Sequence, residues 1–251
     1  MSIKPRSPQS VQIIGHRGCA SPFPENTLEA VLYGIFSGAG MIEVDLRLSK
    51  DQEVILSHDE NLSKITGSNQ NISEKTWEEL SQLEIRKKKE VFHLARLKDV
   101  FKCIPRDIEF YLELKGSRSL LSDRDKNLAD KVISIIKKEK LKKQCLIMSF
   151  NQNIAQYMKY RYPSYRAGII FNSRARLNAF AKKTENKNKI KFDCLAVNHK
   201  LLTERSLQTI WNTKIPFVVW TVNNKRLWKK MIACRPSGIV TDYPEKFSGL
   251  N

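Results

Sequence analysis

The chain has 251 residues and a formal net charge of +18, and 41% of its residues are hydrophobic and 28% charged. This length suits a single α/β barrel and excludes a small fold that depends on disulfide bonds. No apolar run approaches the roughly eighteen residues of a membrane-spanning helix, and no apolar stretch follows the basic N-terminal residues as in a secretory signal. Five cysteines without a C-x-x-C pair favour free thiols in a reducing compartment. We therefore expect a cytoplasmic protein.

The positive charge is spread over several lysine-rich runs rather than gathered in one. These runs lie at residues 86–89, 137–143 and 182–191, and aromatic residues are not interleaved with them. A stacking platform for nucleic acid needs such aromatics. We therefore expect a solvated basic surface and no nucleic-acid partner, while weak contact with an anionic membrane surface stays open.

The first elements in chain order are a strand at residues 11–15 and an amphipathic helix at 26–37. A strand at 42–48 follows, and after four polar residues a second extended run occupies 53–57. That connection is too short for a parallel crossover, so the two runs must form a hairpin.

Residues 60–106 break the alternation of strands and helices. This stretch contains polar turn residues, an amphipathic piece at 77–83, the basic run at 86–89 and a helix near 97–104. We interpret it as an insertion within one barrel domain that spans residues 1–251.

Regular alternation then resumes to the end of the chain, which is typical of parallel βα units. Without the return run of the hairpin, eight strands remain, and this number predicts a (β/α)8 TIM-type barrel. We expect residues 182–191 to form a loop. The later strands lie at 108–114, 145–149, 167–171, 194–197, 217–222 and 237–240, and the later helices at 126–139, 153–161, 203–212 and 225–233.

Acidic side chains share one face of two predicted strands, because residues two apart on a strand point the same way. Glu43 and Asp45 lie opposite an apolar face, and Glu113 and Lys115 repeat the arrangement on a later strand. Three carboxylates turned towards the barrel axis would repel one another without a cation. They would suit Mg²⁺ or Ca²⁺. A solvated acidic edge, neutralised by the lysine, is an equally good interpretation of the spacing.

Two of the four histidines follow predicted strands, where barrel enzymes place their catalytic groups. His16 stands in Gly15-His16-Arg17-Gly18, and His58 follows the return run of the hairpin. Arg17 between two glycines could hold a phosphate with its forked guanidinium. We expect structural roles for His93 and His199.

The ordered set of motifs resembles the glycerophosphodiester phosphodiesterase family from about residue 13 to residue 244. Departures from the family's usual pattern occur around residues 64–65, 95–96 and 236–237. They leave substrate preference more open than the chemistry. The matching motifs, in the family's order, are Gly15-His16-Arg17-Gly18, Pro24-Glu25-Asn26-Thr27, Glu43-x-Asp45, His58-Asp59 with Leu62, Glu113-x-Lys115, Ser149-Phe150, Trp220-Thr221-Val222-Asn223 and Thr241-Asp242-Tyr243-Pro244.

The resemblance implies a metal-dependent hydrolase that releases glycerol 3-phosphate and an alcohol from a small glycerophosphodiester. Glu43, Asp45 and Glu113 would hold the divalent metal, and His16 and His58 would serve as general acid and base. Arg17 and Lys115 would neutralise phosphate charge. Trp220 would form an apolar wall for the glycerol, although ordinary barrel packing accounts for it nearly as well. For Glu25 and Asn26, support of the site and capping of the first helix are equally good interpretations.

Two other functions stay open at this point. One is a lysophospholipase D-like hydrolysis of membrane lysophospholipids, helped by the basic surface and the inserted segment. The other, from a different class, is a non-catalytic barrel that binds polyanions. The presence of every expected catalytic residue weighs against the second.

Overall fold

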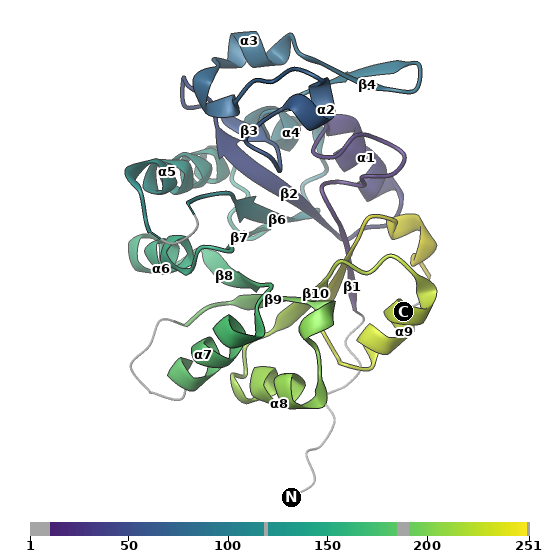
Figure 1. Cartoon of the computed structure of the whole chain (residues 1–251), viewed down its shortest axis with the longest axis vertical. Coiled ribbons are helices and arrows are strands. Elements are labelled where there is room, and N and C mark those ends of the chain that lie inside the picture. The colour runs from purple at the N-terminus through teal and green to yellow at the C-terminus, as the bar shows by residue number, and fades with distance from the viewer. Residues whose placement is uncertain (1–10, 118–119, 185–190, 250–251) are drawn as a thin grey trace, which may run out of the picture.

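A computed structural model describes residues 11–117, 120–184 and 191–249 of the chain. Eight parallel strands form a closed barrel in the order β1-β11-β10-β9-β8-β7-β6-β2, and β1 pairs with both β11 and β2. Figure 1 shows the helices arranged around these strands. The predicted (β/α)8 barrel is confirmed. Its strands are β1 (Gln12–Gly15), β2 (Met41–Leu48), β6 (Glu109–Leu114), β7 (Cys145–Ser149), β8 (Arg166–Phe171), β9 (Cys194–Asn198), β10 (Phe217–Trp220) and β11 (Gly238–Thr241).

The outer helices start at polar capping residues. Ser122, for example, forms a reciprocal capping box with Asp125 at the start of α5, so two otherwise unpaired backbone N–H groups are satisfied. In the described parts of the chain, no helix is both long and apolar enough to cross a membrane. The helices around the barrel are α1 (Leu28–Phe36), α4 (Leu97–Cys103), α5 (Asp123–Lys138), α6 (Gln152–Arg161), α7 (Arg174–Thr184), α8 (Glu204–Asn212) and α9 (Lys225–Ile232), with short turns η2 (His199–Leu201) and η3 (Pro244–Lys246).

Helix α7 is the barrel helix that the sequence patterns did not predict; the antiparallel pair formed by residues 84–87 and 90–93 outside the barrel was not predicted either. It takes in residues 182–184 of the expected loop at 182–191, and residues 185–190 of that loop lie outside the described residues. Leu177 and Phe180 of α7 are buried against the barrel core. The three-residue spacing of these two side chains fits one helix face, but the surrounding lysines and arginines obscure it.

The predicted hairpin after β2 is confirmed. Strand β3 (Val54–Leu56) pairs antiparallel with the end of β2, with Leu46 opposite Leu56. The backbone N–H of Ser57 then donates to the carbonyl of Asp45 at 2.9 Å. The return strand therefore carries His58 back towards the middle of β2.

Residues 60–94 form a layer outside the barrel, at the top of Figure 1, with its own apolar cluster that includes Leu62, Ile72 and Phe92. The insertion expected at 60–106 therefore ends before α4, because Leu97, Val100 and Phe101 of that helix are buried in the main core of the barrel. Lys87 attaches this layer to the loop after β1, because its Nζ donates to the carbonyls of Phe23 at 2.9 Å and Ala20 at 3.4 Å. The elements of this layer are α2 (Ser63–Thr66), η1 (Ile72–Glu74), α3 (Trp77–Ser81), β4 (Glu84–Lys87) and β5 (Glu90–His93).

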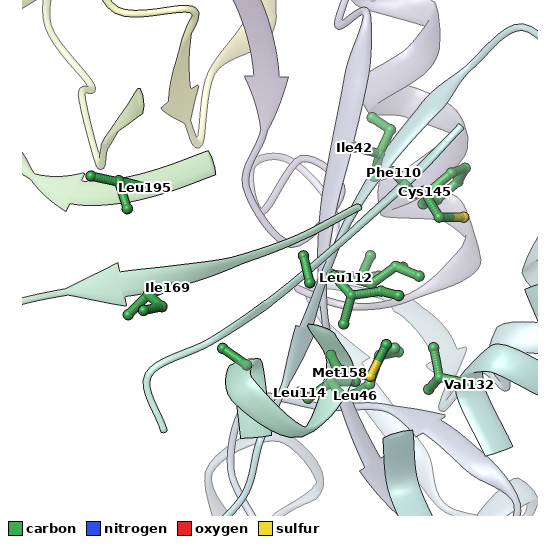
Figure 2. Packing of buried hydrophobic residues seen from close by; sticks show 14 of the residues in the cluster. Ile42, Leu46, Phe110, Leu112, Leu114, Val132, Cys145, Met158, Ile169 and Leu195 are labelled. Atoms are coloured by element: carbon green, nitrogen blue, oxygen red, sulfur yellow. The ribbon is translucent and has the colours of Figure 1, made fainter. Parts of the chain in front are cut away.

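The core has two parts, one on each side of the barrel wall. The larger part packs the outward side chains of the strands against the helices, as Figure 2 shows for Leu112, Val132 and Met158. The smaller part fills the barrel interior with residues such as Tyr111 and Met148. Since Tyr111 points inward, Glu113 two residues later does so as well.

Candidate active site

The Gly15-His16-Arg17-Gly18 loop makes a tight turn at the end of β1. A Cβ atom on Gly15 would lie 2.2 Å from the carbonyl oxygen of Gly18, and one on Gly18 would lie 2.6 Å from the backbone of Ala30. Arg17 itself has φ +52°, in the left-handed region. The backbone N–H of Arg17 donates to Glu43 Oε2 at 2.8 Å. This hydrogen bond helps to offset the cost of the left-handed backbone at Arg17 and connects the loop to β2.

The three predicted carboxylates come together inside the barrel mouth. The exposed fractions of Glu43, Asp45 and Glu113 are 3%, 1% and 7%. One oxygen from each lies within 4.8 Å of the others. Lys115 Nζ lies 2.8 Å from Asp45 Oδ1 and also contacts Glu113. Arg17 Nε lies 3.4 Å from Asp45 Oδ2. The alternative of a solvated acidic edge is therefore wrong.

Burial and crowding split the pKa values of these groups. Burial and the charges of Asp45 and Glu113 raise the pKa of Glu43 well above its usual value. Burial and Asp45 raise the pKa of Glu113 to about 7. For Asp45, burial acts in the same direction, but Lys115 and Arg17 outweigh it and lower the pKa to about 2. Lys115 and Arg17 therefore do not balance the charge of all three carboxylates, and Glu43 and Glu113 resist ionisation unless further positive charge enters the cluster.

This donor set fits a divalent cation. Glu43 Oε1 is buried and has no hydrogen-bond partner among the residues that the structure describes. A buried acceptor of this kind is costly unless something binds it. Three convergent carboxylates match the oxygen coordination of Mg²⁺ or Ca²⁺.

Both predicted histidines lie beside this cluster. His16 Nε2 is 3.9 Å from Glu43 Oε2, while its Nδ1 is 2.5 Å from Asp242 Oδ1. His58 Nδ1 is 2.7 Å from Asp59 Oδ1. Burial, followed by the charge of Lys115, lowers the pKa of His58, so its imidazole is neutral at pH 7.

The Pro-Glu-Asn-Thr motif supports the site instead of only starting α1. Asn26 Nδ2 donates to Asp45 Oδ2 at 2.9 Å, and its Oδ1 accepts from the backbone N–H of Asp45 at 3.0 Å. Glu25 pairs with Arg17 at 2.7 Å. The helix cap is Thr27, whose hydroxyl accepts from the backbone N–H of Ala30. The capping alternative for Asn26 is therefore wrong.

Trp220 lies at the end of β10, and the ring of Phe150 is a neighbour of both Trp220 and Lys115. Its indole packs edge to face on Phe150 with ring centroids 5.6 Å apart. Lys115 Nζ lies 5.7 Å from the centre of the same Phe150 ring. The other two histidines contact backbone carbonyls: His93 that of Leu83, and His199 that of Trp220.

The sequence patterns assigned no role to three residues of the site: Asp242, Asn223 and Asp59. Asp242 and Asn223 belong to motifs that matched the family, but no local pattern linked either residue to His16. Asp59 directly follows His58, and this adjacency was the available signal.

A parallel barrel that gathers acids, bases and cations at the carboxyl ends of its strands is a barrel enzyme. The sequence profile of the Glycerophosphoryl diester phosphodiesterase family matches residues 16–246, and the chain belongs to this family. The predicted family and the predicted class of enzyme are thereby confirmed.

Individual relatives match over nearly the full chain. The glycerophosphodiester phosphodiesterase of Caldanaerobacter subterraneus subsp. tengcongensis is 25% identical over 243 residues, which cover 95% of this chain and 96% of the relative. Human lysophospholipase D GDPD3 is 25% identical over 273 residues, covering 96% and 85%. The crystal structure of the glycerophosphodiester phosphodiesterase of Thermotoga maritima superimposes with a TM-score of 0.80 at 28% identity, covering 97% and 99%.

Proposed function

We propose that this protein hydrolyses glycerophosphodiesters to glycerol 3-phosphate and an alcohol. One observation carries the proposal: two histidines, each paired with a carboxylate, stand beside three buried carboxylates and two cationic side chains at the barrel mouth. This combination suits phosphodiester hydrolysis, because charge on the phosphate must be neutralised while one proton is removed and another delivered.

The carboxylates would hold the cofactor. Glu43, Asp45 and Glu113 would bind Mg²⁺ or Ca²⁺, which when bound would draw charge from the non-bridging phosphate oxygens. Asn26 holds Asp45 in place through two hydrogen bonds. The Arg17 backbone N–H does the same for Glu43.

Two cationic side chains would bind the phosphate. Arg17 is anchored by Glu25 and Asp45, so its guanidinium is oriented before the substrate arrives. Lys115 is held between Asp45 and Glu113. Trp220 and the neighbouring Phe150 would supply the apolar wall of the glycerol subsite.

The two histidines would move the protons. One would take a proton from the attacking hydroxyl, either that of water or the neighbouring hydroxyl of the glycerol. Attack by the glycerol hydroxyl would give a cyclic phosphate, which water opens in a second step to glycerol 3-phosphate. The other would protonate the leaving alcohol, so the P–O bond breaks without releasing an alkoxide. Each group would contribute roughly 10²- to 10⁴-fold to the rate.

A second candidate substrate is a lysophospholipid. Human lysophospholipase D GDPD3 is among the relatives, and residues 60–94 form a layer attached to the loop after β1, the same loop that carries Glu25. We propose that this layer shapes substrate access.

A choline-release assay separates these candidates, because glycerophosphocholine and lysophosphatidylcholine both yield choline on hydrolysis. We expect a higher kcat/KM for glycerophosphocholine and no release from the Glu43→Gln variant. The reverse preference would assign the protein to lysophospholipid hydrolysis. If the folded protein releases choline from neither substrate with Mg²⁺ or Ca²⁺ present, the proposal is wrong. Binding of nucleic acid with a steep salt dependence would then favour the polyanion-binding alternative.

A further inference from the structure

A chain of hydrogen bonds runs along the barrel rim to His16. The residues come from the ends of three neighbouring strands: Asn223 after β10, Asp242 after β11 and His16 after β1. Asn223 Nδ2 donates to Asp242 Oδ2 at 2.5 Å, and Asp242 Oδ1 lies 2.5 Å from His16 Nδ1. The far nitrogen of the imidazole, Nε2, faces Glu43.

The orientation of the Asn223 amide is fixed by its other contacts. The backbone N–H of Asp242 donates to one end of the amide at 2.9 Å, and the hydroxyl of Thr241 lies 3.2 Å from the same atom. Since a backbone N–H can only donate, that end must be the oxygen. The NH₂ end therefore points at Asp242, which can meet it only with an acceptor.

The same reasoning fixes the tautomer of His16. Burial raises the pKa of Asp242, but the hydrogen bond and charge of His16 outweigh it, so the net shift is downward and the carboxylate is ionised at neutral pH. An ionised carboxylate only accepts hydrogen bonds, so His16 Nδ1 carries a proton. In the neutral imidazole the lone pair then lies on Nε2, the atom that faces the carboxylate cluster.

We propose that Asp242 and Asn223 are positioning residues that keep the proton on His16 Nδ1 and leave Nε2 as the only nitrogen that exchanges protons with the substrate. This inference rests on the proposed role of His16 in phosphodiester hydrolysis. The proton on Nδ1 stays in place throughout the reaction, while Nε2 gains a proton in one step and loses it in the other.

His58 offers a contrast within the same site. Its partner, Asp59, is the next residue in the chain, and the side chain of Asp59 is 43% exposed against 26% for Asp242. The second oxygen of Asp59 lies 3.9 Å from the exposed Lys64, and no side-chain amide binds it among the residues that the structure describes. An amide at position 59 could therefore rotate and still present its oxygen to His58.

The Asp242→Asn variant should invert the tautomer of His16. Asn223 would draw the new amide oxygen towards itself, so the new NH₂ group would donate to His16 Nδ1 and move the proton to Nε2. A tautomer inverted in this way costs about 10⁴-fold in kcat in a serine hydrolase. We expect a loss of 10²- to 10⁴-fold in kcat with KM within a few-fold of the wild type.

A charge swap tests the mechanism of that loss. In the double variant Asp242→Asn/Asn223→Asp, the carboxylate at position 223 would accept from the new NH₂ group at position 242. The new amide oxygen would then face His16 Nδ1 and restore its proton. We expect the double variant to recover at least tenfold in kcat over Asp242→Asn. Asp59→Asn should lose clearly less than Asp242→Asn.

Imidazole ¹⁵N NMR of the chelated protein reports the tautomer directly, with the His16 signal assigned by its absence in His16→Ala. We expect the proton on Nδ1 in the wild type and in the double variant, and on Nε2 in Asp242→Asn. Asp130→Asn is the matched control, because Asp130 of α5 accepts from Tyr157 of α6 and from Tyr162 just after that helix, on the outside of the barrel. It should leave kcat unchanged.

The outcomes separate the two proposals. If His16→Ala keeps normal turnover, the proposed role of His16 fails. If His16→Ala is slow but Asp242→Asn is normal, the positioning proposal is overturned while the function stands. The positioning proposal is also overturned if Asp242→Asn folds, keeps the wild-type tautomer and is slow, or if the swap restores the tautomer without restoring kcat.

Discussion

Replacing Glu113 by glutamine should make the free energy of unfolding of the metal-free protein less dependent on pH. Burial and Asp45 raise the pKa of Glu113 from 4.5 to about 7. Below pH 4.5 the carboxyl is protonated in both the folded and the unfolded chain. Between pH 4.5 and 7 the unfolded chain loses the proton first, so stability falls as pH rises and levels off above pH 7.

The size of this loss follows from the shift. A difference of about 2.5 pKa units corresponds to about 3 kcal/mol at pH 8. For a domain of this size, a loss of about 3 kcal/mol lowers Tm by at most roughly 6 to 12 °C. Glu113→Gln also removes one partner of Lys115, which keeps Asp45. The variant is therefore expected to lose stability at pH 5 but to show a smaller fall in Tm between pH 5 and pH 8.

The assay is thermal unfolding of the chelated wild type and variant at both pH values. Asp125→Asn is the control: burial raises the pKa of Asp125, but hydrogen bonds from Ser117 and Ser122 lower it overall. This group is ionised in both states at pH 5 and at pH 8, so the control should lower Tm about equally at each. Parallel Tm curves for the wild type and Glu113→Gln would refute the argument.

Three further predictions concern the proposed site. Mg²⁺ or Ca²⁺ should raise the Tm of the chelated wild type and restore choline release, because the cation relieves repulsion among the three carboxylates; a Tm that does not respond would contradict the metal assignment. Neutralising Arg86, Lys88 and Lys89 should change KM among substrates more than kcat for the best one, as expected of a layer that governs access; a collapse of kcat for every substrate in the folded variant would count against this role. Alanine at either site histidine should cut kcat by about 10²- to 10⁴-fold, with the double variant losing less than the product of the two losses, whereas His93→Ala and His199→Ala should stay within a few-fold of wild type.

The sequence predicted those parts of the fold that local periodicity determines. The two-residue period of the strands placed Glu43 and Asp45 on one face and the apolar residues on the other. The short connection after β2 required a hairpin, and the alternation of strands and helices required a parallel barrel. The lysines and arginines around Leu177 and Phe180 hid helix α7, because its apolar face is narrow.

The contacts that complete the site depend on barrel closure and could not be predicted from local patterns. His16 and Asp242 are 226 residues apart and meet only because β1 pairs with β11. From the sequence alone, Asn26 could equally well cap the first helix. Only the path of the backbone after Arg17 brings the amide of Asn26 to Asp45. In both cases the sequence supplied the residue types and the closed barrel supplied their partners.

The most direct test of the proposed function is the initial rate of glycerol 3-phosphate formation from glycerophosphocholine as free Mg²⁺ or Ca²⁺ is varied. We expect no product in excess chelator, saturable product formation with one of the two cations, and no response in Glu43→Gln, which removes a carboxylate of the cluster. A rate in chelator equal to that with either cation, or full activation of Glu43→Gln by the same cation, would contradict the proposal that these three carboxylates form a metal-dependent phosphodiesterase site.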